Sequence, residues 1–537
     1  MDHHAASSPR TERHRPNVTA ATGGRTLAAS IAPWRGGAGH DSARSGARIG
    51  AMRPLVALLA VLATLAALAA VLLLERERAG LTVTRLQVEG APVTLWRPEG
   101  TAPLPLVVVA HGYGGSRQMM RAIAVTLARS GMAVAALDLP GHGRHPRPMT
   151  GDVTRLDGAT ARLTGDVVAV ARALAARPDM APGLALLGHS MATDIVVRAA
   201  EALSPDAVVA ISMYSEAVTE GAPARLLIVS GAREGRLREA GLEALRLVDP
   251  RAAEGETATA DEVSRRAVAA PLVGHVGVLY APAALREMRD WIAEAFGVAA
   301  RGRPPATALW LGLLLGSVVA LAYPLATVFG PRRDGPPPCP RRTAWAALAL
   351  PVVPSVAAAI TVPPLGGVLA FAPVAAFLAA WGGVQMLALR RAGRRLPPAR
   401  PAAALAFAVW AFGLFALALD RYGASFVPSG PRLGPLLLLL PAGLLYAHAD
   451  ALLTQGASWA FRLAARALPL AALLAAMLLD PPLGVAFTVL PVTVLFWLVF
   501  GTAARWMAAR TGAGTTAPVL GTMLAWAIAA STPVIAG

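Results

Sequence analysis

The chain has 537 residues, of which 55% are hydrophobic and only 15% are charged. An ordinary soluble protein carries about a quarter charged residues, so this balance favours a membrane protein. The net charge of +17 is carried entirely by arginine, because the sequence contains no lysine. These arginines gather in the N-terminal tail and in short loops between apolar segments, which indicates membrane topology and argues against nucleic-acid binding. The single cysteine, Cys339, rules out an intramolecular disulfide.

The N-terminal part divides into a tail and an apolar run. Residues 1–52 are rich in Ala, Ser, Gly, His and Arg without an apolar period, so we expect a disordered tail, or a true start at Met52. Residues 53–75 contain about twenty apolar residues between a basic residue and a charged cluster, enough to span a bilayer. No small-residue cleavage site precedes the charges at Glu75, so we expect an uncleaved transmembrane anchor rather than a signal peptide.

Residues 305–537 consist of hydrophobic segments separated by Pro, Gly or Arg, which predicts a C-terminal all-α transmembrane bundle of about eight helices. The segment 467–480 is short for a full crossing. The expected spans are 306–330, 343–361, 366–389, 402–419, 434–452, 467–480, 483–500 and 515–535.

Arginine placement predicts the orientation of these spans. The loops 331–342 and 390–400, and two later loops around Arg462 and Arg505, are arginine-rich, whereas the alternate connections hold only Arg421 and Arg432. Arginine-rich short loops stay in the cytoplasm. Together with the arginine-, alanine- and glycine-rich composition of a GC-rich genome, this predicts a bacterial inner (plasma) membrane protein whose residues 80–300 lie outside the cytoplasm.

Residues 80–300 have ordinary globular composition, and short apolar strands alternate there with helical patterns. This alternation predicts an α/β domain with a mostly parallel sheet. Helices are expected from Ser116, over 160–177, from Met191 to about Leu203 and near 282–296. Strands are expected at 104–112, 132–141, 184–190, 207–215 and 225–233. Reactive groups gather where such strands end.

Ser190 lies at one of these strand ends, in the sequence Gly188-His189-Ser190-Met191-Ala192. A strand, a G-x-S-x-G turn and a helix form a nucleophile elbow, which holds the serine hydroxyl out of the sheet. Ala192 stands where the second glycine is usual; alanine is small enough to keep the motif. We expect Ser190 to be the nucleophile.

A glycine-rich loop, His111-Gly112-Tyr113-Gly114-Gly115, follows the strand at 104–110. An oxyanion-hole loop belongs at this place in such folds. We expect the backbone N–H groups of Tyr113 and Met191 to be the two donors. His111 is expected to be a structural residue of this loop.

The serine needs a general base, and the order nucleophile, acid, histidine along the chain selects His275 in "PLVGHVGVLY". His189 lies inside the elbow and is expected to point away from Ser190. The acid should follow the strand at 225–230, where Glu234 lies three residues beyond a glycine. Glu216, after the preceding strand, is the alternative acid.

The domain resembles the α/β-hydrolase superfamily, and within it the serine aminopeptidase and monoglyceride-lipase-like branch. The resemblance rests on "HGYGG", "DLPGHGRH", "GHSMA", "GARE" and "GHVG", and covers about 220 residues of the chain. It implies acyl transfer to water through an acyl-serine intermediate, with no metal and no organic cofactor. Only about ten residues separate the strands at 207–215 and 225–233, where many relatives carry a helical lid, so we expect an open site.

The sequence therefore predicts a membrane-anchored serine hydrolase that cleaves carboxylic ester or amide bonds with a Ser190, His275 and Glu234 triad. Its expected partners are the bilayer and an ester, lipid or peptide-like substrate. Two alternatives stay open: a non-catalytic membrane protein that uses the domain as a binding module, and an acyltransferase with the same triad. Retention of every catalytic element argues for the enzyme, since a binding module would be free to lose any of them.

Overall fold

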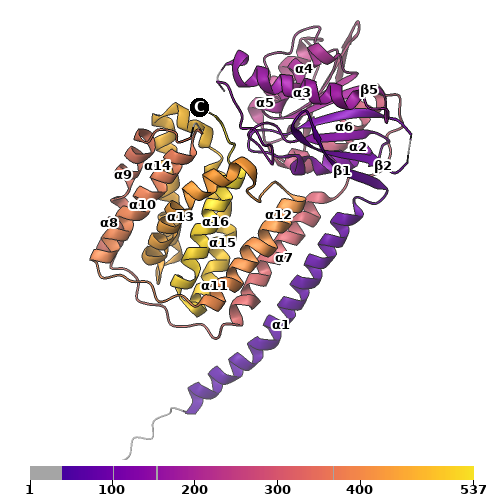
Figure 1. Ribbon diagram of the computed structural model, residues 1–537. Coiled ribbons are helices and arrows are strands. Elements are labelled where there is room, and N and C mark those ends of the chain that lie inside the picture. The colour runs from indigo at the N-terminus through magenta and orange to yellow at the C-terminus, as the bar shows by residue number, and fades with distance from the viewer. Residues whose placement is uncertain (1–38, 101, 153–154, 367, 537) are drawn as a thin grey trace, which may run out of the picture. The chain divides into compact units, whose positions relative to one another are not determined.

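The computed structural model describes residues 39–100, 102–152, 155–366 and 368–536, with side chains from Pro54 onward. Residues 81–296 form an α/β domain around a nine-stranded sheet in the order β1-β2-β4-β3-β5-β6-β7-β9-β8 (Figure 1). The six strands from β4 to β9 in this order are parallel, and β1, β2 and β8 join antiparallel at the two edges. The expected mostly parallel α/β sheet is confirmed. The strands are β1 (Leu81–Val88), β2 (Ala91–Pro98), β3 (Leu104–Ala110), β4 (Ala133–Leu137), β5 (Met180–His189), β6 (Ala207–Ile211), β7 (Arg225–Gly231), β8 (Thr257–Ala260) and β9 (Val263–Ala270).

Helices cover both faces of this sheet, which is why its central strands are continuously apolar. In β3, Leu106, Val108 and Ala110 pack on the face covered by α3 and α4, whereas Val107 and Val109 pack on the face covered by α2 and α6. Because successive side chains of a strand point to opposite faces of the sheet, the apolar residues of β3 contribute to two separate cores. The helices are α2 (Arg121–Ala128), α3 (Ala161–Ala175), α4 (Ala192–Leu203), α5 (Gly235–Arg246) and α6 (Pro282–Ala295).

Within the described residues, nine helices are long and apolar enough to cross a membrane. One is Pro54–Arg76, the apolar part of α1 (Gly39–Arg76), so α1 begins inside the segment expected as a tail. The rest of that tail, residues 1–38, lies outside the described residues. The other eight form the bundle: Thr307–Thr327 (α7), Arg341–Thr361 (α8 and α9), Phe371–Arg391 (α10), Pro401–Tyr422 (α11, η4 and α12), Gly430–Thr454 (η5 and α13), Trp459–Leu479 (α14), Pro481–Thr511 (η6 and α15) and Ala513–Ser531 (α16).

The sixth bundle helix is longer than its apolar run suggested. The sequence predicts a short segment at 467–480, because Arg462 and Arg466 interrupt the hydrophobic pattern before it. In the structure α14 begins at Trp459, and the Ser458 hydroxyl accepts a hydrogen bond from the Phe461 N–H at 3.3 Å as its N-cap. The arginines therefore lie on the first turns of a full-length helix.

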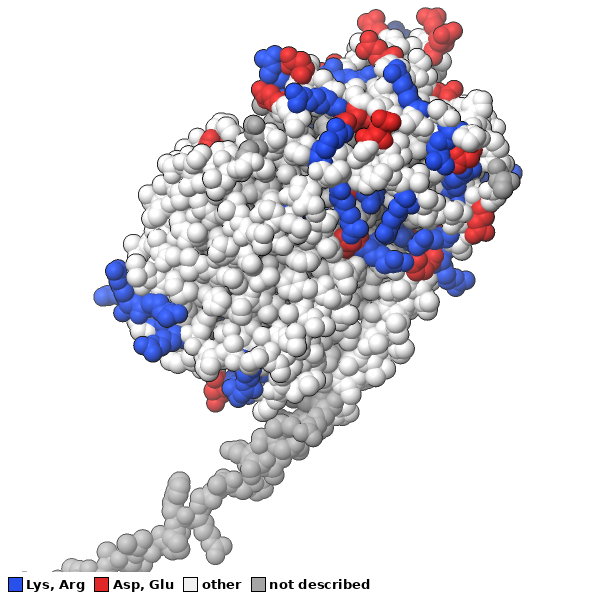
Figure 2. All heavy atoms as spheres, viewed as in Figure 1, with Lys and Arg blue, Asp and Glu red and all other residues white. Residues whose placement is uncertain are grey.

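The charge on the molecular surface changes along the length of the bundle. Figure 2 shows arginines at the end of the bundle remote from the α/β domain, and charges of both signs over that domain, with an uncharged surface between them. Many large apolar residues of the bundle helices are exposed, among them Leu405, Leu437 and Leu498. An uncharged apolar surface between two charged ends is what a bilayer requires.

The other end of the bundle contacts the α/β domain through its short connections. The Ser425 N–H donates to the Ser116 hydroxyl at 3.0 Å, and Arg144 forms an ion pair with Asp420. The C-terminal segment runs beside the loop after β4, where the Met149 N–H donates to the Val534 carbonyl at 2.9 Å. The loops that follow β3 and β4, at the carboxyl edge of the sheet, therefore rest on the bundle.

Arg432 lies in the middle of this contact, with only 4% of its surface exposed. Its guanidinium donates to two carbonyls of the α/β domain, Gly143 at 2.9 Å and Gly141 at 3.0 Å. It also donates to two carbonyls of the bundle, Ala529 at 2.8 Å and Thr532 at 2.7 Å. One buried side chain thus satisfies four carbonyls from both parts of the molecule.

Replacing Arg432 by Gln should lower the free energy of unfolding by about 3 kcal/mol, because buried carbonyls lose charge-assisted donors. The measurement is thermal unfolding of the purified chain in detergent. Arg391→Gln, at an exposed arginine, is the matched control and should unfold like the wild type. Equal melting temperatures for the two variants would contradict a structural role for Arg432.

Candidate active site

Ser190 follows β5 directly and has a left-handed backbone conformation, with φ 53°. This conformation is unfavourable for a residue with a Cβ and persists only where the surroundings hold it. Here the Ser190 N–H donates to the Ile211 carbonyl of β6 at 2.8 Å, and the Ser190 carbonyl accepts from the Thr193 N–H at 2.8 Å. The turn between strand and helix is therefore the expected sharp elbow, with the serine at its apex.

Close backbone packing explains the small residues around this turn. A Cβ at Gly188 would lie 2.3 Å from the Ala192 carbonyl oxygen, and a Cβ at Gly112 would lie 2.9 Å from the Ser190 Cβ. Neither space admits any side chain. Ala192, in place of the usual glycine, is fully buried at the first turn of α4 and keeps helical geometry, so the substitution leaves the elbow intact.

Three side chains that the sequence singled out are joined by hydrogen bonds. His275 Nε2 lies 2.9 Å from Ser190 Oγ, and His275 Nδ1 lies 2.6 Å from Glu234 Oε1. An ionised carboxylate only accepts, so Nδ1 carries the imidazole proton and Nε2 is left to accept from the serine hydroxyl. The three residues come from the carboxyl ends of β5, β7 and β9, far apart in sequence.

The Glu234 carboxylate is well supported inside the domain, with only 6% of its side chain exposed. Burial alone would raise its pKa, but hydrogen bonds from His275, the Gly231 N–H and the Ser212 hydroxyl outweigh it and lower the pKa below its usual value. The Gly231 and Ser212 contacts are 2.6 and 2.8 Å long. Glu234 is therefore held ionised. The alternative acid, Glu216, is exposed to solvent.

Ser212 is a site residue that sequence reasoning missed. It follows β6 with a left-handed φ of 53° and donates to the Glu234 oxygen that does not face His275. The sequence places Ser212 inside the strand expected at 207–215, whereas β6 ends at Ile211 and leaves Ser212 just beyond it. Many serines occupy such places, so this place alone does not separate it from an ordinary loop residue.

His189 is a second missed contributor. His189 Nε2 donates to the His275 carbonyl at 2.9 Å, so the ring faces the loop that carries His275. Burial lowers the pKa of His189 to about 4, and the neighbouring His275 adds to this shift. His189 is consequently neutral around pH 7 and fixes the backbone of the loop that carries His275.

The glycine-rich loop lies beside the serine, as the Gly112 contact shows. His111 is fully buried and structural: His111 Nδ1 donates to the Gly112 carbonyl at 2.8 Å, and Nε2 accepts from the Leu139 N–H at 3.1 Å. Within the described residues, no backbone carbonyl accepts a hydrogen bond from the N–H of Tyr113 or Met191. The Tyr113 hydroxyl donates to the Val485 carbonyl of the bundle at 2.6 Å.

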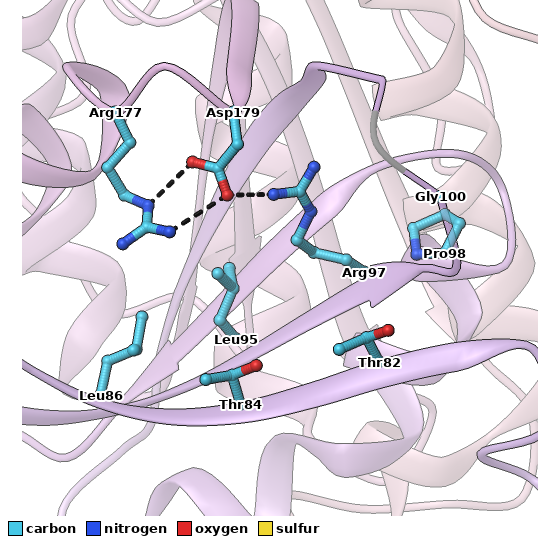
Figure 3. A pocket seen from close by; sticks show the side chains of 9 residues that line it. All are labelled: Thr82, Thr84, Leu86, Leu95, Arg97, Pro98, Gly100, Arg177 and Asp179. Carbon is cyan, nitrogen blue, oxygen red and sulfur yellow. Dashed lines mark hydrogen bonds and ion pairs between the residues drawn. The ribbon is translucent and has the colours of Figure 1, made fainter.

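The His275 side chain is reachable from solvent, because 45% of it is exposed. No helix lies between β6 and β7, in agreement with the expected absence of a lid there. The hollow in Figure 3 is a different place, between the β1–β2 ribbon and the turn before β5, where Asp179 pairs with Arg97 and Arg177. It adjoins the amino ends of the parallel strands, so it is not the catalytic cleft.

Replacing His189 by Gln should make the protein less sensitive to acid. The folded-state pKa of about 4 lies below the value of 6.5 in the unfolded chain, so the unfolded chain binds the proton more readily. The contribution of neutral His189 to the free energy of unfolding is therefore fully present above pH 6.5. It falls by about 3 kcal/mol as the pH falls towards 4.

Chemical unfolding in detergent at pH 7, 5 and 4 measures this loss for wild type and His189→Gln. The buried His111, His142 and His145 remain in both proteins, so the difference isolates His189. Parallel pH dependences for the two proteins would contradict the assignment.

Comparison with known proteins supports the fold. Residues 101–270 match the family described as serine aminopeptidase, S33. A protein from Thermus thermophilus is 22% identical over 40% of this chain and 98% of its own, with a TM-score of 0.28. A dienelactone hydrolase from Anabaena variabilis is 20% identical over 41% of this chain and 98% of its own, with a TM-score of 0.31.

A membrane phospholipase A, described as a bacterial virulence factor, is 16% identical over 48% of this chain and 97% of its own, with a TM-score of 0.31. No curated protein matches the chain in sequence. The family match covers the segment from β3 to β9, with the elbow and Glu234 inside it. The segment between the N-terminal apolar helix and the bundle is therefore similar to this hydrolase family over residues 101–270, and it has the mostly parallel α/β sheet expected of an α/β hydrolase.

Proposed function

We propose that the chain is a membrane-anchored serine hydrolase that cleaves carboxylic esters through Ser190, His275 and Glu234. The observation that carries this proposal is the unbroken series of contacts from Ser190 Oγ to His275 and on to the buried Glu234, at 2.9 and 2.6 Å. A serine hydroxyl is a weak nucleophile until an adjacent base accepts its proton. The geometry supplies that base and holds it in the required tautomer.

In the acylation step, Ser190 Oγ attacks the ester carbonyl carbon as His275 Nε2 takes the hydroxyl proton. The carbonyl oxygen becomes an oxyanion, which the N–H groups of Tyr113 and Met191 stabilise. Collapse of the tetrahedral intermediate breaks the bond to the leaving alcohol, which receives the proton from His275. The acyl group stays on Ser190 as an ester.

In the second step, His275 Nε2 takes a proton from water, whose oxygen attacks the acyl-serine carbonyl. Breakdown of this second intermediate returns the proton to Ser190 and releases the carboxylic acid. Glu234 stays ionised throughout and stabilises the imidazolium that forms twice in the cycle. An alcohol acceptor in place of water would make the same site an acyltransferase, and product analysis distinguishes the two.

The membrane setting suggests where the substrate lies. The loops after β3 and β4 rest on one end of the bundle, and the elbow contacts the first of these loops. The opposite end carries the arginine-rich loops, which the positive-inside rule places in the cytoplasm. We therefore infer that the domain works on the extracytoplasmic side, on esters at or near the membrane surface.

Ser190→Ala should abolish ester hydrolysis, and Glu234→Gln should lower kcat by about 10³- to 10⁴-fold, because His275 loses its orienting carboxylate. Hydrolysis of p-nitrophenyl acetate by the purified chain in detergent provides the measurement. Glu216→Gln is the matched control and should keep wild-type kcat. Undiminished turnover by Ser190→Ala would remove the basis of the proposal.

Topology reporters test the location. A reporter fused after Gly537 should read as extracytoplasmic, since the C-terminal segment pairs with the loop after β4. A reporter inserted in the loop 390–400 should read as cytoplasmic. The reverse pattern would place the α/β domain inside the cell.

A further inference from the structure

We infer that the membrane bundle is part of the catalytic apparatus: its turn at residues 481–488 positions Tyr113, and with it the N–H proposed to stabilise the oxyanion. This inference rests on the proposed function. It assigns the bundle a role in the chemistry in addition to anchoring. Tyr113 and the turn are more than 360 residues apart in the chain.

The first observation is the environment of the Tyr113 side chain. Its hydroxyl donates to the Val485 carbonyl at 2.6 Å, and its ring stacks on Phe487 with centroids 5.2 Å apart and an angle of 18° between the planes. Burial raises the pKa of the Tyr113 phenol, so the hydroxyl keeps its proton and stays a donor. The α/β domain supplies one ring contact, an edge-on approach to His142 at 5.5 Å.

The second observation is the composition of the loop that carries Tyr113. Three of its neighbours, Gly112, Gly114 and Gly115, are glycines, whose backbone has the greatest conformational freedom. Gly114 has a φ of 69°, and a Cβ there would lie 3.1 Å from Thr488 Cγ2 of the bundle. The bundle thus contacts the loop at two successive residues.

The third observation is the firmness of the bundle turn. Its 3-10 helix, η6 (Pro481–Ala486), begins with two prolines, and the Phe487 N–H donates to the Gly484 carbonyl at 3.0 Å. Leu483 and Ala486 are buried in the bundle core. Phe487 is fixed at its backbone and remains 52% exposed. The turn is therefore held by prolines, a backbone hydrogen bond and buried side chains, and it contacts a loop whose glycines constrain the backbone little.

The chemical consequence follows from the geometry that oxyanion donors require. A donor must point at the developing oxyanion within a few tenths of an ångström, and its loss costs about 10²- to 10³-fold in kcat. Removing a contact of the Tyr113 side chain leaves its N–H present but less well oriented. The loss in kcat should therefore be smaller than the loss on removing the donor. The effect should fall on kcat and leave KM unchanged, because the contact acts through the transition state.

The experiment uses the full chain in detergent, with p-nitrophenyl acetate as substrate and a fluorophosphonate as a probe of the activated serine. Tyr113→Phe removes only the bond to Val485, and Phe487→Ala removes only the stacked ring. Each should lower kcat and the rate of phosphonylation by about tenfold, with KM within about twofold of wild type. Phe487→Tyr keeps the ring and should restore wild-type kcat.

Arg144→Gln is the control for a general weakening of the boundary, because it breaks a contact between the domain and the bundle, the ion pair to Asp420, that includes no residue of the glycine-rich loop. It should retain wild-type kcat. A wild-type phosphonylation rate in both Tyr113→Phe and Phe487→Ala would overturn the inference, as would an equal loss in Arg144→Gln. A wild-type protein that reacts with neither probe contradicts the proposed function itself, which separates the two failures.

Discussion

The left-handed backbone at Ser190 is the constraint on which the catalytic geometry depends. A strand can pass into a helix this abruptly only if the neighbouring residues are small: Gly188 and Gly112 have no side chain, and Ala192 has only a methyl group. Ser212 beyond β6 and Leu272 beyond β9 also have positive φ, at 53° and 64°. Three of the non-glycine residues with positive φ thus lie at the carboxyl edge of the sheet, and the Leu272 side chain, three residues before His275, is 81% exposed.

The same edge of the sheet contacts the bundle, and this shared boundary explains why several polar groups are buried there. Arg432 is buried and forms no ion pair within the part of the chain that the structure describes, yet its four carbonyl contacts join the loop after β4 to the C-terminal segment. Tyr113 reaches across to Val485 from the loop after β3. Polar groups that would be unsatisfied in either part alone are satisfied where the two meet. The bundle and the α/β domain therefore share a boundary at which each supplies hydrogen-bond partners to the other.

Much of this arrangement could be predicted from local sequence. The strand-turn-helix pattern around Ser190, the order of Glu234 and His275 along the chain, and the apolar segments all follow from residue types at short spacing. The contacts of Ser212, His189 and Tyr113 could not be predicted from the sequence, because each joins residues that only the folded chain brings together. The sequence did not reveal β9 either. Its Arg265 is fully buried and donates to the Ala244 carbonyl at 2.9 Å, so this buried strand lacks the continuous apolar pattern by which the other parallel strands were predicted.

Fluorophosphonate labelling of membranes that carry the wild type, Ser190→Ala and His275→Ala tests the central claim most directly. A fluorophosphonate reacts only with a serine whose proton is accepted by a base, so the reaction reports the Ser190–His275 contact without a known substrate. The account predicts labelling of the wild type and of neither variant. Labelling that persists in Ser190→Ala, or a folded wild type that does not react, would contradict an activated serine at the elbow.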